Sequence, residues 1–126
     1  MRVFRTRAFS RLEVARQLSD ADLRAAVAEM NNGLWDVNLG GQVYKKRVAL
    51  QGHGKRGGAR TLVAFKRDDR AFFVYGFSKK QRRNVTSNET QGLKRLAGEL
   101  FRSSERQVEQ ALKHGELIEI QVQEYG

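Results

Sequence analysis

The sequence contains no cysteine, which excludes disulfides, thiolate metal sites and cysteine nucleophiles. This absence fits a reducing cytosol, and we expect a cytoplasmic protein. Long apolar runs are also missing, because none approaches the roughly 18 residues that a membrane-spanning helix needs. The basic N-terminal stretch has neither a continuous apolar core nor a small-residue cleavage site, so we expect no signal peptide.

Clusters of His, Asp and Glu at metal-ligand spacing are missing too, so we expect no metal and no cofactor. The 126 residues fit one domain, and a hydrophobic content of 40% is enough for a core. We therefore expect a single domain over residues 1–126, in which residues 104–126 form a terminal helix and a strand.

Acidic residues are scarce in the middle of the chain. Residues 37–88 contain 13 lysines and arginines but only two acids, which gives this segment a net charge of +11. The remaining residues contain 11 basic and 12 acidic side chains, so the excess of +10 lies entirely in this segment. Charge of one sign indicates a polyanion or an acidic protein as partner, and we favour nucleic acid.

Three short runs in the middle of the chain are typical of strands. They cover residues 42–50, 60–66 and 71–78, and short links between them predict an antiparallel meander. The third run is rich in aromatic residues and apolar on both faces, so we place it at the centre of the sheet. Residues 51–59 hold four glycines and are expected to form a loop. Residues 1–5 predict an edge strand and residues 116–124 a last strand.

Helices are predicted on either side of this meander. A short first helix is expected over residues 9–18, and Ser19 begins a start signal for a helix over residues 21–30. Thr86 and Glu89 form the pattern of a capping box before a clean apolar stripe. Ser104 begins another such signal, and Gly115 ends that helix.

The cations of the middle segment converge on one face of the predicted sheet. Lys45 and Arg47 share a strand face, and Arg60 begins the next strand and can return to it. The third strand is followed by four further cations, Lys79, Lys80, Arg82 and Arg83. Such convergence suits a phosphodiester backbone or a phosphorane transition state. The alternative is that these side chains are merely solvated.

Other polar and aromatic residues allow two interpretations. The glycines of residues 51–59 serve a turn or a phosphate nest, and the sequence lacks the spacing of a P-loop. His53 is either a base or incidental, whereas His114 fits a structural role at a helix C-terminus. We expect Trp35, Phe72, Phe73 and Phe77 to be core residues rather than stacking platforms. Tyr44 and Tyr75 could each stack on a base.

Three motifs in order resemble the HigB-like branch of the RelE toxin superfamily. They are K-x-R-V-A at residues 45–49, G-K-x-G-G-x-R at residues 54–60 and Y-G-F-x-K at residues 75–79. The closing ALKHGELIEI is also similar to this branch. The resemblance implies an α+β fold in which helices pack on one face of a small, twisted, mainly antiparallel sheet. It also implies a toxin with a cognate antitoxin protein as partner.

The resemblance further implies a metal-independent endoribonuclease that cuts mRNA, typically on the ribosome. In such a reaction the RNA 2′-OH attacks its own phosphodiester, and a cyclic phosphate and a free 5′-OH result. The chemistry needs a base, cations for the phosphorane and an acid for the leaving oxygen. RelE-type sites fill these roles largely with Lys and Arg.

By this likeness Arg60 clamps the phosphate, and Lys45 and Arg47 are the paired cations of the preceding strand. One of the two can serve as base if its neighbours lower its pKa, and Lys45 is the better candidate because an arginine is effectively always protonated. Lys79 and Arg82 match the basic segment that stabilises the leaving group. The remaining expected contacts to nucleic acid are Lys46, Lys55, Arg56, Lys80, Arg83 and Tyr75.

One departure from the family concerns the acid. RelE carries a late tyrosine near the basic segment, and residues 84–88 contain none, so Tyr75 or Lys79 would have to replace it. Two alternatives therefore remain. The first is a non-catalytic toxin or nucleic-acid-binding module of the same fold, such as a ParE-like gyrase inhibitor or a DNA-binding regulator. The second is a basic protein that only docks an acidic partner.

Overall fold

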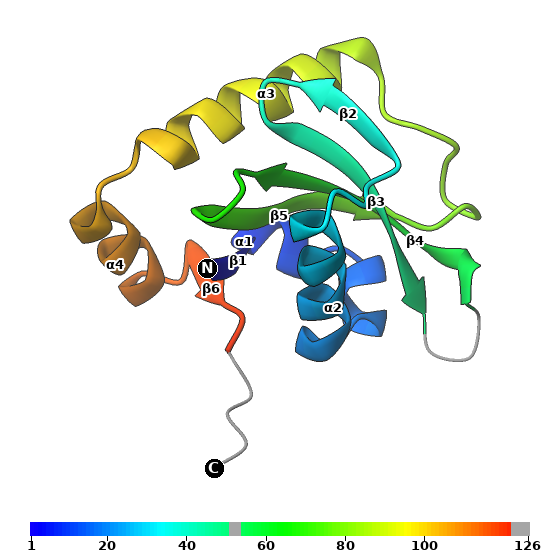
Figure 1. Ribbon diagram of the computed structural model, residues 1–126, viewed down its shortest axis with the longest axis horizontal. Helices are drawn as coiled ribbons and strands as arrows, with labels where there is room; N and C mark the ends of the chain where they lie inside the picture. The colour runs from blue at the N-terminus through cyan, green and yellow to red at the C-terminus, as the bar shows by residue number, and fades with distance from the viewer. Residues whose placement is uncertain (51–53, 122–126) are drawn as a thin grey trace.

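The computed structural model describes residues 1–50 and 54–121, and side chains of residues 54–56 are left out of the description. Over these residues the chain forms a six-stranded sheet with helices on both faces (Figure 1). In chain order the elements are β1 (Arg2–Thr6), α1 (Arg7–Ser10), the 3-10 helix η1 (Val14–Gln17), α2 (Asp20–Asn31), β2 (Val37–Gly40), β3 (Val43–Leu50), β4 (Gly54–Phe65), β5 (Arg70–Phe77), α3 (Ser87–Arg102), α4 (Glu105–Lys113) and β6 (Leu117–Glu119).

The strands lie in the order β2-β3-β4-β5-β1-β6. All neighbours pair antiparallel except β1 and β5, which are parallel. The predicted meander of β3, β4 and β5 is confirmed, and so is the mainly antiparallel α+β class. The expectation that the first strand lies at an edge is wrong, because β1 is inserted between β5 and β6.

The sheet is apolar on both faces, and each face carries its own core. Along β4, Val63 and Phe65 pack with α1, η1 and α2, whereas Leu62 and Ala64 pack with α3 and α4. Side chains alternate along a strand, so a run that is apolar at every position must be covered twice. The expectation of helices on one face only is therefore wrong. Figure 1 shows α2 and α3 on opposite sides of the sheet.

Helix starts follow the predicted capping residues. Ser19, Thr86 and Ser104 each accept a hydrogen bond from the third residue of their helix, and each forms a complete capping box. Such boxes satisfy amide groups that have no partner inside the helix. The box at Thr86 fixes the start of α3, which follows the basic segment of residues 79–83.

Several predicted boundaries are wrong. Strand β4 begins at Gly54, so residues 54–59 belong to a strand, because they pair with β3 despite their glycines. The first helix is split into α1 and η1, and the last strand covers only Leu117–Glu119 of the described residues. Residues 122–124, which the prediction also placed in that strand, lie outside the described residues. Strand β2 was not expected, since three of its four residues are exposed. A turn with positive φ at Gly40, Gly41 and Gln42 returns β2 onto β3.

Candidate nucleic-acid interface

Lys45, Arg47 and Arg60 lie on the sheet face that α3 and α4 partly cover. Arg47 is directly opposite Arg60 in the β3–β4 ladder, and Arg60 is opposite Phe77 of β5. Opposite residues of antiparallel strands share a face, and Lys45 precedes Arg47 by two residues. The prediction that Arg60 returns to the face of Lys45 and Arg47 is thus confirmed.

These cations surround an open hollow of about 200 Å³ over the middle of β3 and β4. The segment after β5 brings Arg83 and Asn84 to the same hollow. Besides Lys46, four cationic residues therefore line the hollow together with one carboxylate, and Phe77 supplies an apolar wall. The residues that line the hollow are Asp36, Val37, Lys45, Lys46, Arg47, Arg60, Thr61, Leu62, Phe77, Arg83 and Asn84.

Asp36 is the carboxylate at this hollow, and it orients Arg47. Its Oδ2 accepts the backbone N–H of Arg47 at 2.7 Å, and its Oδ1 lies 3.3 Å from Arg47 Nε. The sequence analysis missed Asp36, although it directly precedes the basic segment. The only sequence feature that could have indicated a role for Asp36 is its position as a single acid beside a run of cations.

Arg60 is half-buried, and its Nη1 donates to the carbonyl of Gly58 at 3.3 Å. Among the described residues, no carboxylate pairs with it. Asp69, the nearest acid along the chain after Asp68, lies 3.7 Å from Lys66 Nζ and 4.0 Å from Arg70 Nε instead. No ion pair with a described carboxylate therefore competes with an anionic ligand for the guanidinium of Arg60.

Lys46 is a correction to the predicted set. It points to the opposite face, where it is buried, and its Nζ lies 2.9 Å from Oε1 of Glu29 on α2. Strand alternation places it there, one residue from both Lys45 and Arg47. Because only 5% of its side chain is exposed, Lys46 is not available to a nucleic acid in this structure.

Arg82 has all three guanidinium nitrogens occupied. Its Nη2 and Nη1 donate to the two carboxylate oxygens of Glu89 at 2.6 and 2.8 Å, and Nη1 also donates to the Tyr75 hydroxyl at 3.1 Å. Its Nε donates to the carbonyl of Asn84 at 2.8 Å. The guanidinium also lies over the rings of Tyr75 and Phe77, 5.8 and 5.7 Å from their centroids.

This arrangement has an electrostatic consequence for Glu89. The hydrogen bonds from Arg82, followed by that from the backbone of Thr86, lower the pKa of Glu89 from 4.5 to about 2. Glu89 is also the capping-box residue of α3. One carboxylate thus joins the basic segment, Tyr75 and the N-terminus of α3.

The other predicted contacts differ in how they are placed. Lys79 and Lys80 are exposed in the turn after β5, and Arg83 is exposed at the hollow. Lys55 and Arg56 belong to β4, on a stretch whose side chains are not described. His53 lies outside the described residues.

The aromatic residues separate into core and surface. Phe72, Phe73 and Phe77 are buried, as predicted for core residues. Trp35 is half-buried, with its ring centroid 4.9 Å from that of Tyr44. Tyr44 packs on the α2 side of the sheet, away from the cations.

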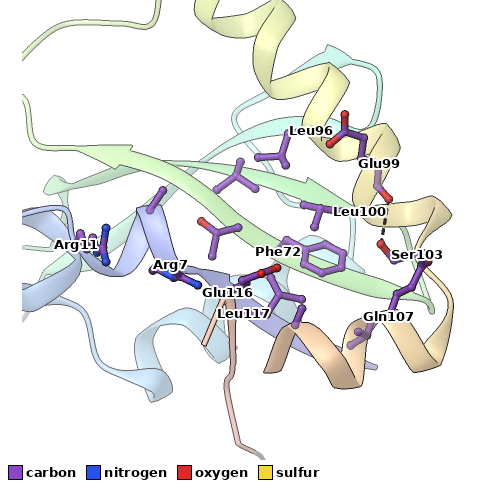
Figure 2. A pocket seen from close by; sticks show the side chains of 15 residues that line it. Arg7, Arg11, Phe72, Leu96, Glu99, Leu100, Ser103, Gln107, Glu116 and Leu117 are labelled. Carbon is purple, nitrogen blue, oxygen red and sulfur yellow. Dashed lines mark hydrogen bonds between the residues drawn. The ribbon is translucent and has the colours of Figure 1, made fainter. Parts of the chain in front are cut away.

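A second hollow lies elsewhere on the α3 side of the sheet and is mainly apolar. It has a volume of about 740 Å³, and Phe72 and Leu117 form its floor between α3 and α4 (Figure 2). None of the residues that line it lines the cationic hollow.

Two absences concern only residues 1–50 and 54–121. In that part of the chain, no group of three or more His, Asp or Glu side chains could hold a metal ion. No helix there is both long enough and apolar enough to cross a membrane.

The fold and the hollow define a small, basic α+β protein with clustered cations on one face of its sheet. Residues 1–120 match the family described as the RelE toxin of the RelE / RelB toxin-antitoxin system. The chain belongs to this RelE toxin family, so it is a toxin of a toxin–antitoxin system with an antitoxin as partner. Among curated proteins, none matches the sequence.

Proposed function

We propose that this toxin is a metal-independent endoribonuclease that cuts mRNA, in association with the ribosome, and so inhibits translation. The observation that carries the proposal is the hollow in which Lys45, Arg47, Arg60 and Arg83 meet a single carboxylate. Cations held around one point are what a phosphorane needs, because its charge exceeds that of the phosphodiester. Membership of the RelE family establishes the class of toxin, and the cationic hollow supports the proposed cleavage reaction.

The proposed reaction assigns one role to each side chain. Arg60 holds the scissile phosphate through its planar fork, and Arg47, oriented by Asp36, holds a second oxygen. Lys45 accepts the proton of the attacking 2′-OH while its side chain is the neutral amine, and it becomes an ammonium in the step; arginine stays protonated and cannot take this role. The oxygen attacks phosphorus, the bond to the 5′-oxygen breaks, and Lys79 protonates that leaving oxygen. The products are a 2′,3′-cyclic phosphate and a 5′-OH.

Further cations extend the contact to neighbouring phosphates. In this proposal Arg83 and Lys80 bind the RNA beyond the scissile bond, and Lys55 and Arg56 bind it along β4. Such contacts position the strand without reading its bases.

Arg82 has a positioning role in this proposal. Its nitrogens are already engaged with Glu89, Tyr75 and Asn84, so it holds the basic segment against the sheet rather than the phosphate. The Tyr75 hydroxyl is bound by the same group, and this favours Lys79 over Tyr75 as the acid.

One observation favours a second candidate function. The chain has no tyrosine at residues 84–88 and Tyr75 is occupied, so the acid role rests on an exposed lysine alone. A toxin without an acid would bind nucleic acid or gyrase through the same cations without cutting RNA. This is the ParE-like or DNA-binding alternative.

The test is to incubate the purified toxin with an mRNA, with and without ribosomes, in the presence of EDTA. We expect cleaved RNA with 2′,3′-cyclic phosphate and 5′-OH ends, and cleavage that EDTA does not reduce. Growth arrest without RNA cleavage, together with inhibited gyrase, would support the second candidate. Cleavage that stops on chelation would overturn the metal-independent mechanism.

A further inference from the structure

We propose that a small polar hollow beside the cationic hollow holds the base of the nucleotide on the 5′ side of the cut, and that it prefers guanine or uracil. This inference rests on the proposed ribonuclease function, because it names the nucleotide that the same site takes. The polar hollow has a volume of about 190 Å³ and lies where β2 and β3 meet the segment after β5 and the first turns of α3. The residues that line it are Leu39, Lys45, Asn84, Val85, Ser87, Thr90 and Gln91.

The polar hollow continues the cationic hollow. Lys45 and Asn84 line both, so a ligand that fills the two passes these side chains. In the proposed reaction Lys45 takes the proton of the attacking 2′-OH, and that hydroxyl belongs to the ribose on the 5′ side of the scissile phosphate. With the phosphate in the cationic hollow and this ribose beside Lys45, the base of the same nucleotide is the group that reaches the polar hollow.

The lining of the polar hollow suits a base rather than a second phosphate. Leu39 and Val85 are half-buried and supply apolar surface for the face of a ring. Among the described residues, Lys45 is the only cation that lines it. The capping box places the carboxylate of Glu89 at the start of α3, where it accepts the N–H of Thr86 at 2.8 Å, and this charge repels a further anion. The volume is below the roughly 300–1,000 Å³ of pockets for drug-sized ligands, which suits a single base.

Three of the polar side chains in this hollow come from one face of α3. Ser87, Thr90 and Gln91 are spaced three and four residues apart, so they lie together on the first turns of the helix. The turn after β2 packs closely on the same helix, since a Cβ on Gly41 would come within 2.9 Å of Lys94 Cγ. The side of the hollow that β2 forms is therefore held against α3 before any RNA binds.

Asn84 gives the hollow a preference among bases, because the oxygen of its amide is already engaged. Its Oδ1 accepts the backbone N–H of Val85 at 2.9 Å, and no described residue accepts a hydrogen bond from its Nδ2. Guanine and uracil carry a carbonyl oxygen where adenine and cytosine carry an amino group. The amide of Gln91, which has no hydrogen-bond partner among the described residues, can pair with either pattern by rotating. The free N–H groups of Asn84 pair only with the carbonyl, so this residue selects guanine or uracil.

The test compares where the parent toxin and its variants cut an mRNA library of randomised sequence in the presence of ribosomes, with the base 5′ of each cut read by sequencing. We expect the parent to cut after guanine or uracil about tenfold more often than after adenine or cytosine. Asn84→Asp should reverse this preference, because a carboxylate accepts from an amino group. Gln91→Ala should weaken the preference about threefold, as the loss of one hydrogen bond does. The matched control is Gln110→Ala, an exposed glutamine of α4 outside both hollows, which should keep the parent preference.

A parent toxin that cuts without regard to this base would overturn the inference, and so would an Asn84→Asp toxin that cuts with the parent's preference. If the parent cuts no RNA, the ribonuclease proposal fails by itself, and the polar hollow is tested by binding. The probes are two uncleavable 2′-deoxy oligonucleotides, one with uracil and one with cytosine at every position, which differ in the group that Asn84 would contact. Tighter binding of the uracil probe, reversed in Asn84→Asp, would support the base site. Equal affinity for the two probes would overturn it.

Discussion

At the residue scale, Arg60 is the side chain on which the proposed chemistry most depends. Arg47 and Phe77 are its partners in the ladder, and no carboxylate of the described residues forms an ion pair with it. We expect Arg60→Ala to reduce RNA cleavage about a hundredfold, on the order of 3 kcal/mol in transition-state stabilisation. Arg60→Lys should restore little, because an ammonium cannot hold a phosphate bidentately. Single-turnover cleavage rates measure both effects.

The control for this experiment is Arg102→Ala, an exposed residue at the end of α3. It should cleave RNA at the parent rate. A folded Arg60→Ala toxin that keeps the parent rate would remove Arg60 from the site. Equal losses of thermal stability and activity would instead indicate a structural role.

A second prediction at this scale concerns Arg82 and Glu89, which are proposed to position the basic segment rather than to contact the RNA. Replacing Glu89 by Gln removes the charge that holds Arg82, so the segment that carries Lys79 and Arg83 loosens. We expect kcat to fall about tenfold with an unchanged KM for RNA, since geometry rather than binding is lost. Steady-state kinetics on a short RNA provide the measurement.

Two further variants separate position from charge. Arg82→Ala combined with Glu89→Ala should lose no more activity than either change alone, because both remove one coupled contact. Additive losses, or a rise in KM alone, would mean that Arg82 contacts the RNA directly.

At the element scale, α4 is attached to the sheet by a cluster of arginines. Arg70 of β5 is buried, and it donates to the carbonyl of Ser103, the C-cap of α3, at 2.8 Å and to Glu105, the first residue of α4, at 2.5 Å. Arg2 of β1 pairs with Glu105, Glu109 and Glu119. These contacts join β1 and β5 to α4 and β6 near the end of the described residues.

Removing the buried member of this cluster should therefore destabilise the fold. We expect Arg70→Ala to lower the free energy of unfolding by about 2 kcal/mol, because a charged hydrogen bond to a carbonyl is lost. Urea denaturation gives this value, and Arg106→Ala, on an exposed position of α4, is the control. A loss no larger than that of the control would show that α4 packs without the arginines.

Patterns over a few neighbouring residues predicted these helices and strands well. They could not predict contacts between residues that are far apart in the sequence. The capping boxes at Thr86 and Ser104 fix helix starts because all their partners lie within four residues. Alternation along β3 separated Lys46 from Lys45, but nothing local indicates that Glu29 covers it. The glycines of residues 54–59 suggested a loop, and pairing with β3 overrode that preference.

The candidate site was likewise predicted only in part. Strand register follows from alternation and short links, and this is why the shared face of Lys45, Arg47 and Arg60 could be foreseen. The engagement of Arg82 by Glu89 bridges a loop and a helix start, and the role of Asp36 depends on the unexpected strand β2. Both contacts depend on the three-dimensional path of the chain, which the local sequence does not indicate.

At the scale of the whole molecule, the charge of +11 in residues 37–88 predicts strongly salt-dependent RNA binding. If about five phosphates are contacted, the logarithm of the association constant should fall with that of salt at a slope of roughly −3.5. Filter binding of an uncleavable RNA between low and physiological salt measures the slope. A flat response would remove the electrostatic argument.

Carboxylates with lowered pKa values also predict how the whole molecule responds to acid. The pKa of Glu89 is about 2, and hydrogen bonds from Arg70 and Arg2 lower those of Glu105 and Glu119. Each contributes stability above its usual pKa of 4.5, and that stability is lost as pH falls through the folded-state value. The melting temperature should therefore fall steadily below pH 4.5. Glu89→Gln should flatten the curve between pH 4.5 and 2, and an unchanged curve would contradict this.

The position of β1 inside the sheet determines when, during synthesis, the sheet can be completed. Arg2 pairs with Arg70 and Phe4 with Glu119, so β1 can complete its pairing only after β5 and β6 have been made. At roughly 5–20 residues per second, β1 emerges roughly 6–20 s before β6. The sheet is complete only after β6 has been made. An antitoxin present at that moment therefore meets the toxin while it folds.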